Sequence, residues 1–162
     1  MGRIRLLPAL AALVLAAAAC GGGGGGDEPL SKQDYQQRLT QASSDLRASA
    51  QGVGSDLTKI LSGQGDFQKA ADDLGKVRGQ LDETADNLDD VTPPEDAQEA
   101  HDDLVSALHA YSDDLGDFQD ALESGDRTEV RKQVAALASL DSVEDLQSAS
   151  QKLKSLGLTF QT

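Results

Sequence analysis

The chain has 162 residues, of which 38% are hydrophobic, 26% charged and 3% aromatic, and its formal net charge is −14. This length predicts a single domain. The excess of 28 Asp and Glu over 14 Lys and Arg excludes nucleic acid as a default partner, because binding phosphate needs clustered positive charge. The single cysteine excludes an internal disulfide framework, and no apolar run reaches the roughly 18 residues of a membrane span.

Residues 1–19 have the pattern of an export signal. Two arginines precede an apolar stretch that is too short to span a bilayer, and small residues lead up to Cys20. The segment Ala17-Ala18-Ala19-Cys20 resembles the lipobox of bacterial lipoproteins, with alanine at position 17 where the family prefers leucine. The resemblance implies that Cys20 carries fatty acyl groups such as palmitate, becomes the new N-terminus and holds the protein on the outer face of the cell membrane. The alternative is an ordinary cleaved signal that leaves a free thiol.

The segment 20–30 is expected to be a flexible tether. It contains the run Gly21–Gly26, and consecutive glycines have no preferred conformation and bury nothing. We expect it to span roughly 17–20 Å on average, taking about 5–6 Å per square root of residue number. The tether would join the lipidated cysteine to a folded domain over residues 31–162.

Apolar residues recur every three or four positions beyond the tether, which predicts helices and no strand. The first helix is expected over residues 31–61, with Ser31 as its N-cap. Gly52 and Gly54 each cost a helix about 1 kcal/mol relative to alanine, so a kink or break is expected there. A second helix is expected over residues 66–91.

The segment Thr92-Pro93-Pro94-Glu95 predicts the start of the third helix. Threonine can cap a helix, proline suits the first helical position, and glutamate completes a capping box. Gly125 is a natural residue to end this helix. The fourth helix is expected to begin at Asp126, and its apolar phase slips near residues 140–142, so it should be either kinked or split in two.

Long helices joined by loops of about four residues or fewer pack as antiparallel neighbours. The sequence therefore predicts an all-α, up-down-up-down four-helix bundle after the signal peptide and glycine-rich tether. In this arrangement the second and third helices are neighbours, and so are the first and fourth. Small alanine side chains should bring the helices close together, so no large internal cavity is expected.

The histidines do not form a metal or catalytic pattern. His101 and His109 both lie on the third expected helix, and neither follows a glutamate at the Glu-x-x-His spacing of di-metal bundles. Ser106, His109 and Asp113 share a helix face like a hydrolase triad, but mid-helix N–H groups are already bonded and offer no oxyanion hole. We predict no metal site, no cofactor and no enzymatic activity, and we expect His101 to be a packed, hydrogen-bonded residue.

Acidic residues are concentrated in residues 66–124, which hold 18 Asp and Glu against three Lys and Arg. One interpretation is a solvated face that keeps an exported protein dispersed. The other is a docking surface for a cationic protein or a weak site for divalent cations. The candidate residues for that surface are Asp102, Asp103, Asp113, Asp114, Asp117 and Asp120.

The stretch from Pro93-Pro94 through His101 and Leu104 to Gly125 resembles small helical lipoproteins of high-GC Gram-positive bacteria. The resemblance covers roughly residues 90–125 and the signal. It implies a membrane-anchored helical domain outside the cell and transfers no catalytic residue.

Together these features predict a non-enzymatic lipoprotein of the extracytoplasmic membrane face, which serves as a binding or accessory module of the cell envelope. Its expected partners are the membrane, through the lipid on Cys20, and a cationic protein or divalent cations. The alternative is a small-ligand or cation-sensing helical domain, in which His101, Tyr111 and acids line a groove between helices.

Overall fold

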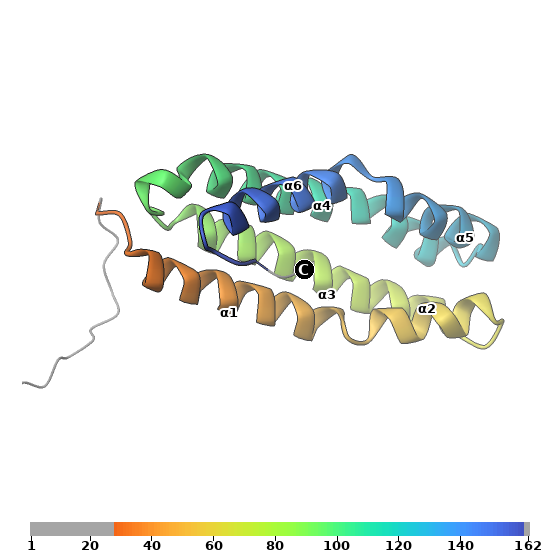
Figure 1. Ribbon diagram of the computed structural model, residues 1–162. Helices are drawn as coiled ribbons and strands as arrows, with labels where there is room; N and C mark the ends of the chain where they lie inside the picture. The colour runs from red at the N-terminus through yellow and green to blue at the C-terminus, as the bar shows by residue number, and fades with distance from the viewer. Residues whose placement is uncertain (1–27, 161–162) are drawn as a thin grey trace, which may run out of the picture.

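The computed structural model describes residues 28–160, and all statements about structure refer to these residues. Within them lie six α-helices and two short 3-10 helices, and no strand. The helices form four antiparallel passes along one long axis (Figure 1). The predicted all-α four-helix bundle is therefore confirmed. The predictions of a signal peptide, a lipidated Cys20 and a flexible tether before residue 28 lie outside the described residues.

The first pass is broken in the middle, as the glycines predict. Helix α1 covers Lys32–Ala50 and helix α2 covers Val53–Leu61. The Ser31 hydroxyl accepts a hydrogen bond from the Asp34 backbone N–H at 3.2 Å, which confirms the expected N-cap. Helix α2 has no side-chain cap, because Gly52 stands at its N-cap position.

The second pass is the single helix α3, Phe67–Asp89. Its N-cap is Asp66, whose carboxylate accepts a hydrogen bond from the Lys69 backbone N–H at 3.1 Å. Leucine, valine and alanine side chains follow one face of α3 and are buried. This face supplies one side of the bundle core.

The third pass starts differently from the prediction. A 3-10 turn, η1, covers Glu95–Ala97, and helix α4 covers Gln98–Ser124 without a side-chain N-cap. The predicted capping box at Thr92 is wrong, because a residue before proline is pushed out of the helical region and two prolines follow in sequence. The backbone carbonyl of Thr92 instead accepts a hydrogen bond from the Leu30 N–H at 2.9 Å.

The fourth pass is split, one of the two expected outcomes. After Gly125, whose φ of +70° ends α4 as predicted, helix α5 covers Arg127–Ala136. The 3-10 turn η2 covers Leu137–Ser139, and helix α6 covers Asp141–Ser155. Leu140 between them is extended, with ψ of 136°.

The residues after α6 fold back onto the bundle. Gly157 has a φ of +79°, which glycine adopts readily and which reverses the chain direction. Leu158 and Phe160 are buried behind it. The Gln36 side chain accepts a hydrogen bond from the Thr159 N–H at 2.7 Å, which ties this C-terminal segment to α1.

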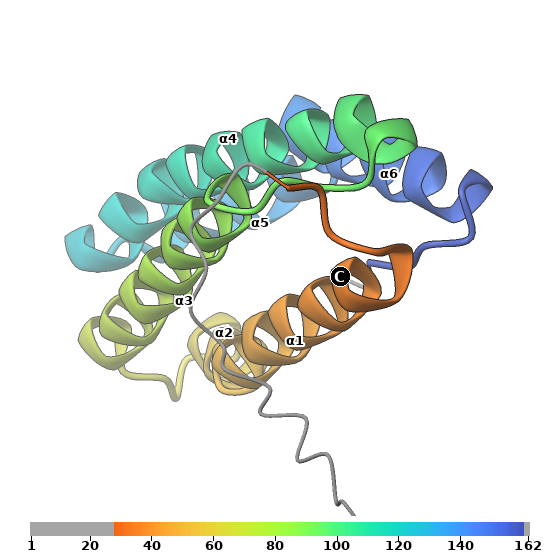
Figure 2. The same ribbon diagram turned by 90° about the vertical axis from the view of Figure 1, so that its left-hand side faces the viewer.

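The bundle is open along one side. Helix α3 packs mainly on α4, α1 packs on α3, and α6 packs on α4, but α1 and α6 hardly touch each other. Figure 2 shows α1 and α6 apart, with the C-terminal segment crossing between them. The expectation that the first and fourth passes are neighbours is therefore wrong for α1 and α6, although α2 and α5 do meet at the far end.

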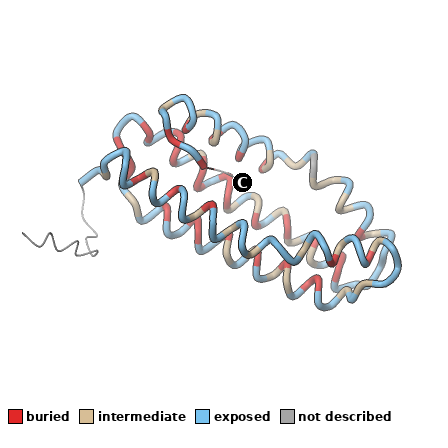
Figure 3. Tube along the Cα trace, turned by 60° about the horizontal axis from the view of Figure 1, so that its bottom comes forward, coloured by how far each residue is buried: buried red, intermediate tan, exposed pale blue. Residues whose placement is uncertain are grey.

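The core lies between these helices. Buried positions recur on the inward faces along the whole length of the bundle (Figure 3). Helices α3 and α4 contribute most of it, because each has neighbours on two sides. The largest fully buried side chains in the core are those of Tyr35, Leu39, Ile60, Leu104, Leu108, Phe118, Leu122, Val130, Leu153 and Leu158.

Candidate functional site

Two of the six predicted docking acids contact side chains of helix α6. The Asp103 carboxylate forms an ion pair with the Lys152 ammonium at 2.6 Å, and Asp114 accepts a hydrogen bond from the Ser142 hydroxyl at 2.5 Å. Both contacts attach α6 to α4. These two acids therefore belong to the helix–helix interface and not to a free surface.

The other four predicted docking acids are exposed on α4. Asp102 accepts a hydrogen bond from the Gln98 amide at 2.8 Å. Asp113, Asp117 and Asp120, which we call the acidic stripe, have no hydrogen-bond or ion-pair partner within the described residues. Their spacing of four and three residues places them on one face of the helix. These three residues are the predicted docking acids that have no partner within the described part of the fold.

Acidic residues also stand at helix ends where they oppose the helix dipole. Neither α3 nor α4 has a basic residue in its last turn, and Asp89 and Glu123 lie there instead. A negative charge at a helix C-terminus is unfavourable by roughly 0.3–1 kcal/mol at low ionic strength. Residues 66–124, which we call the acidic half, therefore carry negative charge that lowers the stability of the helices they form.

Salt is expected to stabilise the protein because of this self-repulsion. Raising ionic strength from 0.01 M to 0.1 M shortens the screening length from about 30 Å to about 10 Å. We expect the thermal midpoint to rise by about 2–4 °C, equivalent to roughly 1 kcal/mol. Differential scanning calorimetry in sodium chloride measures it, and a midpoint that falls with salt would contradict this account of the acidic half.

His101 is buried and paired. Its Nδ1 lies 2.9 Å from the Tyr35 hydroxyl, with both side chains inside the core. Burial lowers the pKa of His101 and raises the pKa of Tyr35, so both groups are neutral in the folded protein. The prediction that His101 is packed and hydrogen-bonded is confirmed, and the alternative that placed it beside Tyr111 in a groove is wrong for His101.

His109 faces the acids of α3. Its ring nitrogens lie 3.8 Å from Asp82 and 3.7 Å from Asp86, on the surface of the bundle. Neither Ser106 nor Asp113 is hydrogen-bonded to it. Residues 28–160 contain no group of three or more His, Cys, Asp and Glu side chains placed to hold a metal ion.

A chain of ion pairs joins the first turn of α2 to the first half of α3. The buried Asp56 carboxylate lies 2.5 Å from the Lys69 ammonium, which also lies 2.6 Å from Asp73. The hydrogen bond from Lys69, followed by that from Lys76, lowers the pKa of Asp73 to about 2. These residues hold α2 against α3 and present no opening for a ligand.

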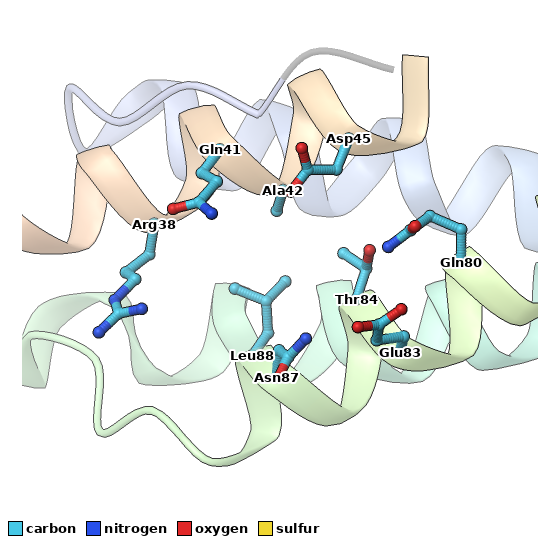
Figure 4. A pocket seen from close by; sticks show the side chains of 9 residues that line it. All are labelled: Arg38, Gln41, Ala42, Asp45, Gln80, Glu83, Thr84, Asn87 and Leu88. Carbon is cyan, nitrogen blue, oxygen red and sulfur yellow. The ribbon is translucent and has the colours of Figure 1, made fainter. Parts of the chain in front are cut away.

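A polar cleft of about 290 Å³ separates α1 from α3. Figure 4 shows its side chains reaching from the two helices into the space between them. Its polar side chains form no hydrogen bond or ion pair within the described residues, and they include Thr84, which is only 4% exposed. The lining residues are Arg38, Gln41, Ala42, Asp45, Gln80, Glu83, Thr84, Asn87 and Leu88.

An apolar groove of about 330 Å³ lies on the opposite flank of α1, along the open side of the bundle. Sequence patterns did not reveal it, because its walls come from helices far apart in the chain. Tyr111 lines it, as the small-ligand alternative expected for this residue. The lining residues are Ser43, Leu46, Arg47, Ala50, Val77, Leu81, Leu108, Tyr111, Val143, Leu146 and Gln147.

No protein-family model matches the chain, and no curated protein or solved structure is significantly similar to it. In the part of the chain that the structure describes, no helix is long and apolar enough to cross a bilayer. The function proposed next therefore rests on the residues and geometry of this chain alone.

Proposed function

We propose that this protein is a lipid-anchored, non-enzymatic binding module on the extracytoplasmic face of the cell membrane. The observation that carries the proposal is the order of segments along the chain. The lipobox-like residues ending at Cys20 and the run of glycines are followed at once by the folded unit, whose first cap is Ser31. A spacer of this kind separates an anchored end from a domain that must move freely above a surface.

The position of the chain entry in the bundle supports this proposal. Residues 28–31 enter at one end of the long axis, beside the connection between α3 and α4 (Figure 1). The Leu30–Thr92 backbone hydrogen bond and a 2.6 Å ion pair between Lys32 and Asp96 hold the entry there. A tether rooted at one end leaves the long sides of the bundle accessible to partners.

Replacing Cys20 with serine is expected to abolish anchoring. Two acyl chains hold a protein on a bilayer far better than the marginal binding of one, and serine provides no sulfur to accept them. The wild-type protein should partition into the detergent phase, whereas the Cys20→Ser variant should appear in the aqueous phase or stay unprocessed. Gly26→Ser, a change in the tether, is the control. Mass spectrometry that finds an unmodified thiol on Cys20 of the mature protein would disprove lipidation.

The acidic stripe is the surface that we propose for a cationic partner. Its three aspartates are exposed and unpartnered within the described residues, and the ends of α3 and α4 keep acids at a cost in stability. Charge that a protein keeps against its own stability is typical of functional surfaces. Complementary charge would steer the partner to this face and set its orientation.

Neutralising the acidic stripe tests whether these aspartates bind a partner or only keep the protein soluble. The variant Asp113→Asn/Asp117→Asn/Asp120→Asn should be as stable as the wild type or more stable, because like charges are removed. It should also lose the partner that is crosslinked to the wild-type protein in intact cells. The matched control neutralises three exposed acids of α6, with the changes Asp141→Asn, Glu144→Gln and Asp145→Asn, and should keep that partner. If the stripe variant keeps every partner, the acidic face only solvates the protein.

A small-ligand domain is the second candidate function, and two specific observations favour it. The polar cleft and the apolar groove flank α1 on opposite sides, and both have volumes within the usual range of ligand sites. A cation-sensing role has less support, because the described residues contain no cluster of metal-ligating side chains.

A further inference from the structure

Four helices line the apolar groove. Helix α1 contributes Leu46, α3 contributes Leu81, α4 contributes Leu108 and α6 contributes Leu146. The groove remains open to solvent because α6 packs on α4 and not on α1. Apolar surface of this kind gains free energy when an apolar group replaces water in it.

A polar hollow of about 200 Å³ adjoins the groove. Ser43 and Arg47 line both spaces, so the hollow and the groove adjoin at these residues, and we call the place where they adjoin the mouth of the groove. Thr40, Ser44 and Thr159 complete its lining. The hollow therefore places a guanidinium and several hydroxyls next to the apolar groove.

Hydrogen-bond donors in the hollow are available to a ligand. Arg47 has no ion-pair partner, and the Ser44 hydroxyl makes no hydrogen bond, within the described residues. The Thr159 hydroxyl accepts from the Gln36 amide at 3.0 Å, which leaves its own hydrogen free to be donated. Arginine offers several N–H donors in a fork that matches a carboxylate.

The charge at this site is opposite to that of the chain. The protein has 28 Asp and Glu, yet no Asp or Glu of residues 28–160 lines the groove or the hollow. Among these described residues, Arg47 is the one charged side chain in either lining. Tyr111 at the inner wall is half-buried and its pKa is raised by burial and by Asp114, so its hydroxyl remains neutral. A negatively charged head group would find a cation at the mouth and no carboxylate beside it.

We propose that the groove and the hollow together bind a medium-chain alkyl carboxylate, with the alkyl chain in the apolar groove and the carboxylate at Arg47. The groove has about 330 Å³, roughly twice the 150 Å³ of an apolar cavity that accepts benzene. This volume suits a single medium-length alkyl chain and not a diacyl lipid. The proposal goes beyond the anchoring function and does not depend on it.

Isothermal titration with decanoate tests the proposal. The protein is the full chain with Cys20→Ser, which carries no acyl group of its own to occupy the groove. Decanoate should bind saturably with one site per chain. Decyltrimethylammonium, which has the same alkyl length and a positive head group, should bind at least about tenfold more weakly because Arg47 repels it. Absence of saturable decanoate binding would overturn the proposal.

A matched pair of charge reversals locates the head group. Arg47 and Arg38 are both exposed, unpaired arginines of α1, but Arg47 lines the hollow whereas Arg38 lines the polar cleft. Arg47→Glu should weaken decanoate binding by about tenfold or more, and Arg38→Glu should leave it within about twofold. Any binding to the apolar residues before Cys20 is common to both variants and cancels in the comparison. Equal affinities of the two variants would overturn the assignment of Arg47.

Filling the groove locates the alkyl chain. Ala50 is exposed at the rim, so Ala50→Trp adds volume to the groove without removing core atoms. This variant should lose decanoate binding and keep the helical circular dichroism of the parent. Undiminished binding by a folded Ala50→Trp variant would overturn the placement of the chain. If this variant fails to fold, Leu46→Trp, a second change in the groove lining, is judged by the same criterion.

Discussion

Replacing Phe118 with alanine is expected to lower the free energy of unfolding by about 3–5 kcal/mol. Phe118 is 1% exposed on α4, the helix that packs on both α3 and α6. Truncation removes the buried ring and leaves a cavity, which the surrounding structure closes only in part. Domains of this size are stable by only about 5–15 kcal/mol, so this single change consumes a large share of the total. Urea unfolding followed by circular dichroism measures it.

Phe67→Ala is the matched control, because the same atoms are removed from a half-buried position at the start of α3. The expected cost is about 1 kcal/mol, since part of the ring is already in water. Equal losses for the two phenylalanine variants would show that the core does not lie along α4 as the structure places it.

Tyr35→Phe is expected to destabilise the fold by about 1–3 kcal/mol, although it removes one oxygen and no ring atom. The change leaves the buried Nδ1 of His101 without its partner at 2.9 Å. His101→Leu should be costly in the same way, because it strands the Tyr35 hydroxyl. The double variant should be more stable than the sum of the two single effects predicts, since both polar groups are then gone. A double-mutant cycle in urea measures the coupling, and strict additivity would mean that the hydrogen bond contributes nothing.

The buried Tyr35–His101 pair also predicts how the stability of the fold changes with pH. Burial lowers the pKa of His101 in the folded state, so below the unfolded value of about 6.5 the unfolded chain binds a proton that the folded chain does not. Stability is therefore expected to fall as pH drops from 7 toward 5, by at most about 1.4 kcal/mol per pH unit for one proton. His101→Leu should remove this slope. His109 is present in both proteins, so the difference between them reports on His101 alone.

Local signals predicted most of the fold. The helix starts at Ser31 and Asp126, the end at Gly125 and the break near Gly52 all depend on residues within a few positions of one another. The one local prediction that failed, the capping box at Thr92, involved two competing signals in the same segment. Consecutive prolines held the backbone extended, and this restraint outweighed the capping preference of threonine.

The site was only partly predictable. Sequence patterns identified the acidic half and the six candidate aspartates, but not which of them the fold would use. Lys152 reaches Asp103 from a helix about fifty positions later in the chain, and only packing brings the two together. The acidic stripe is what remains of the predicted surface once Asp103 and Asp114 contact α6 and Asp102 accepts a hydrogen bond from Gln98 of its own helix.

By itself, the sequence determined the helical class, most of the helix boundaries and the segregation of charge, because periodicity, caps and composition act over a few neighbouring residues. Only the tertiary structure decided that Tyr35 meets His101, that α1 and α6 stay apart, and that a groove opens between them. These features depend on which side chains from distant helices fill the same space. The C-terminal segment crosses between α1 and α6 and buries Leu158 and Phe160, and this packing joins residues that are far apart in the chain.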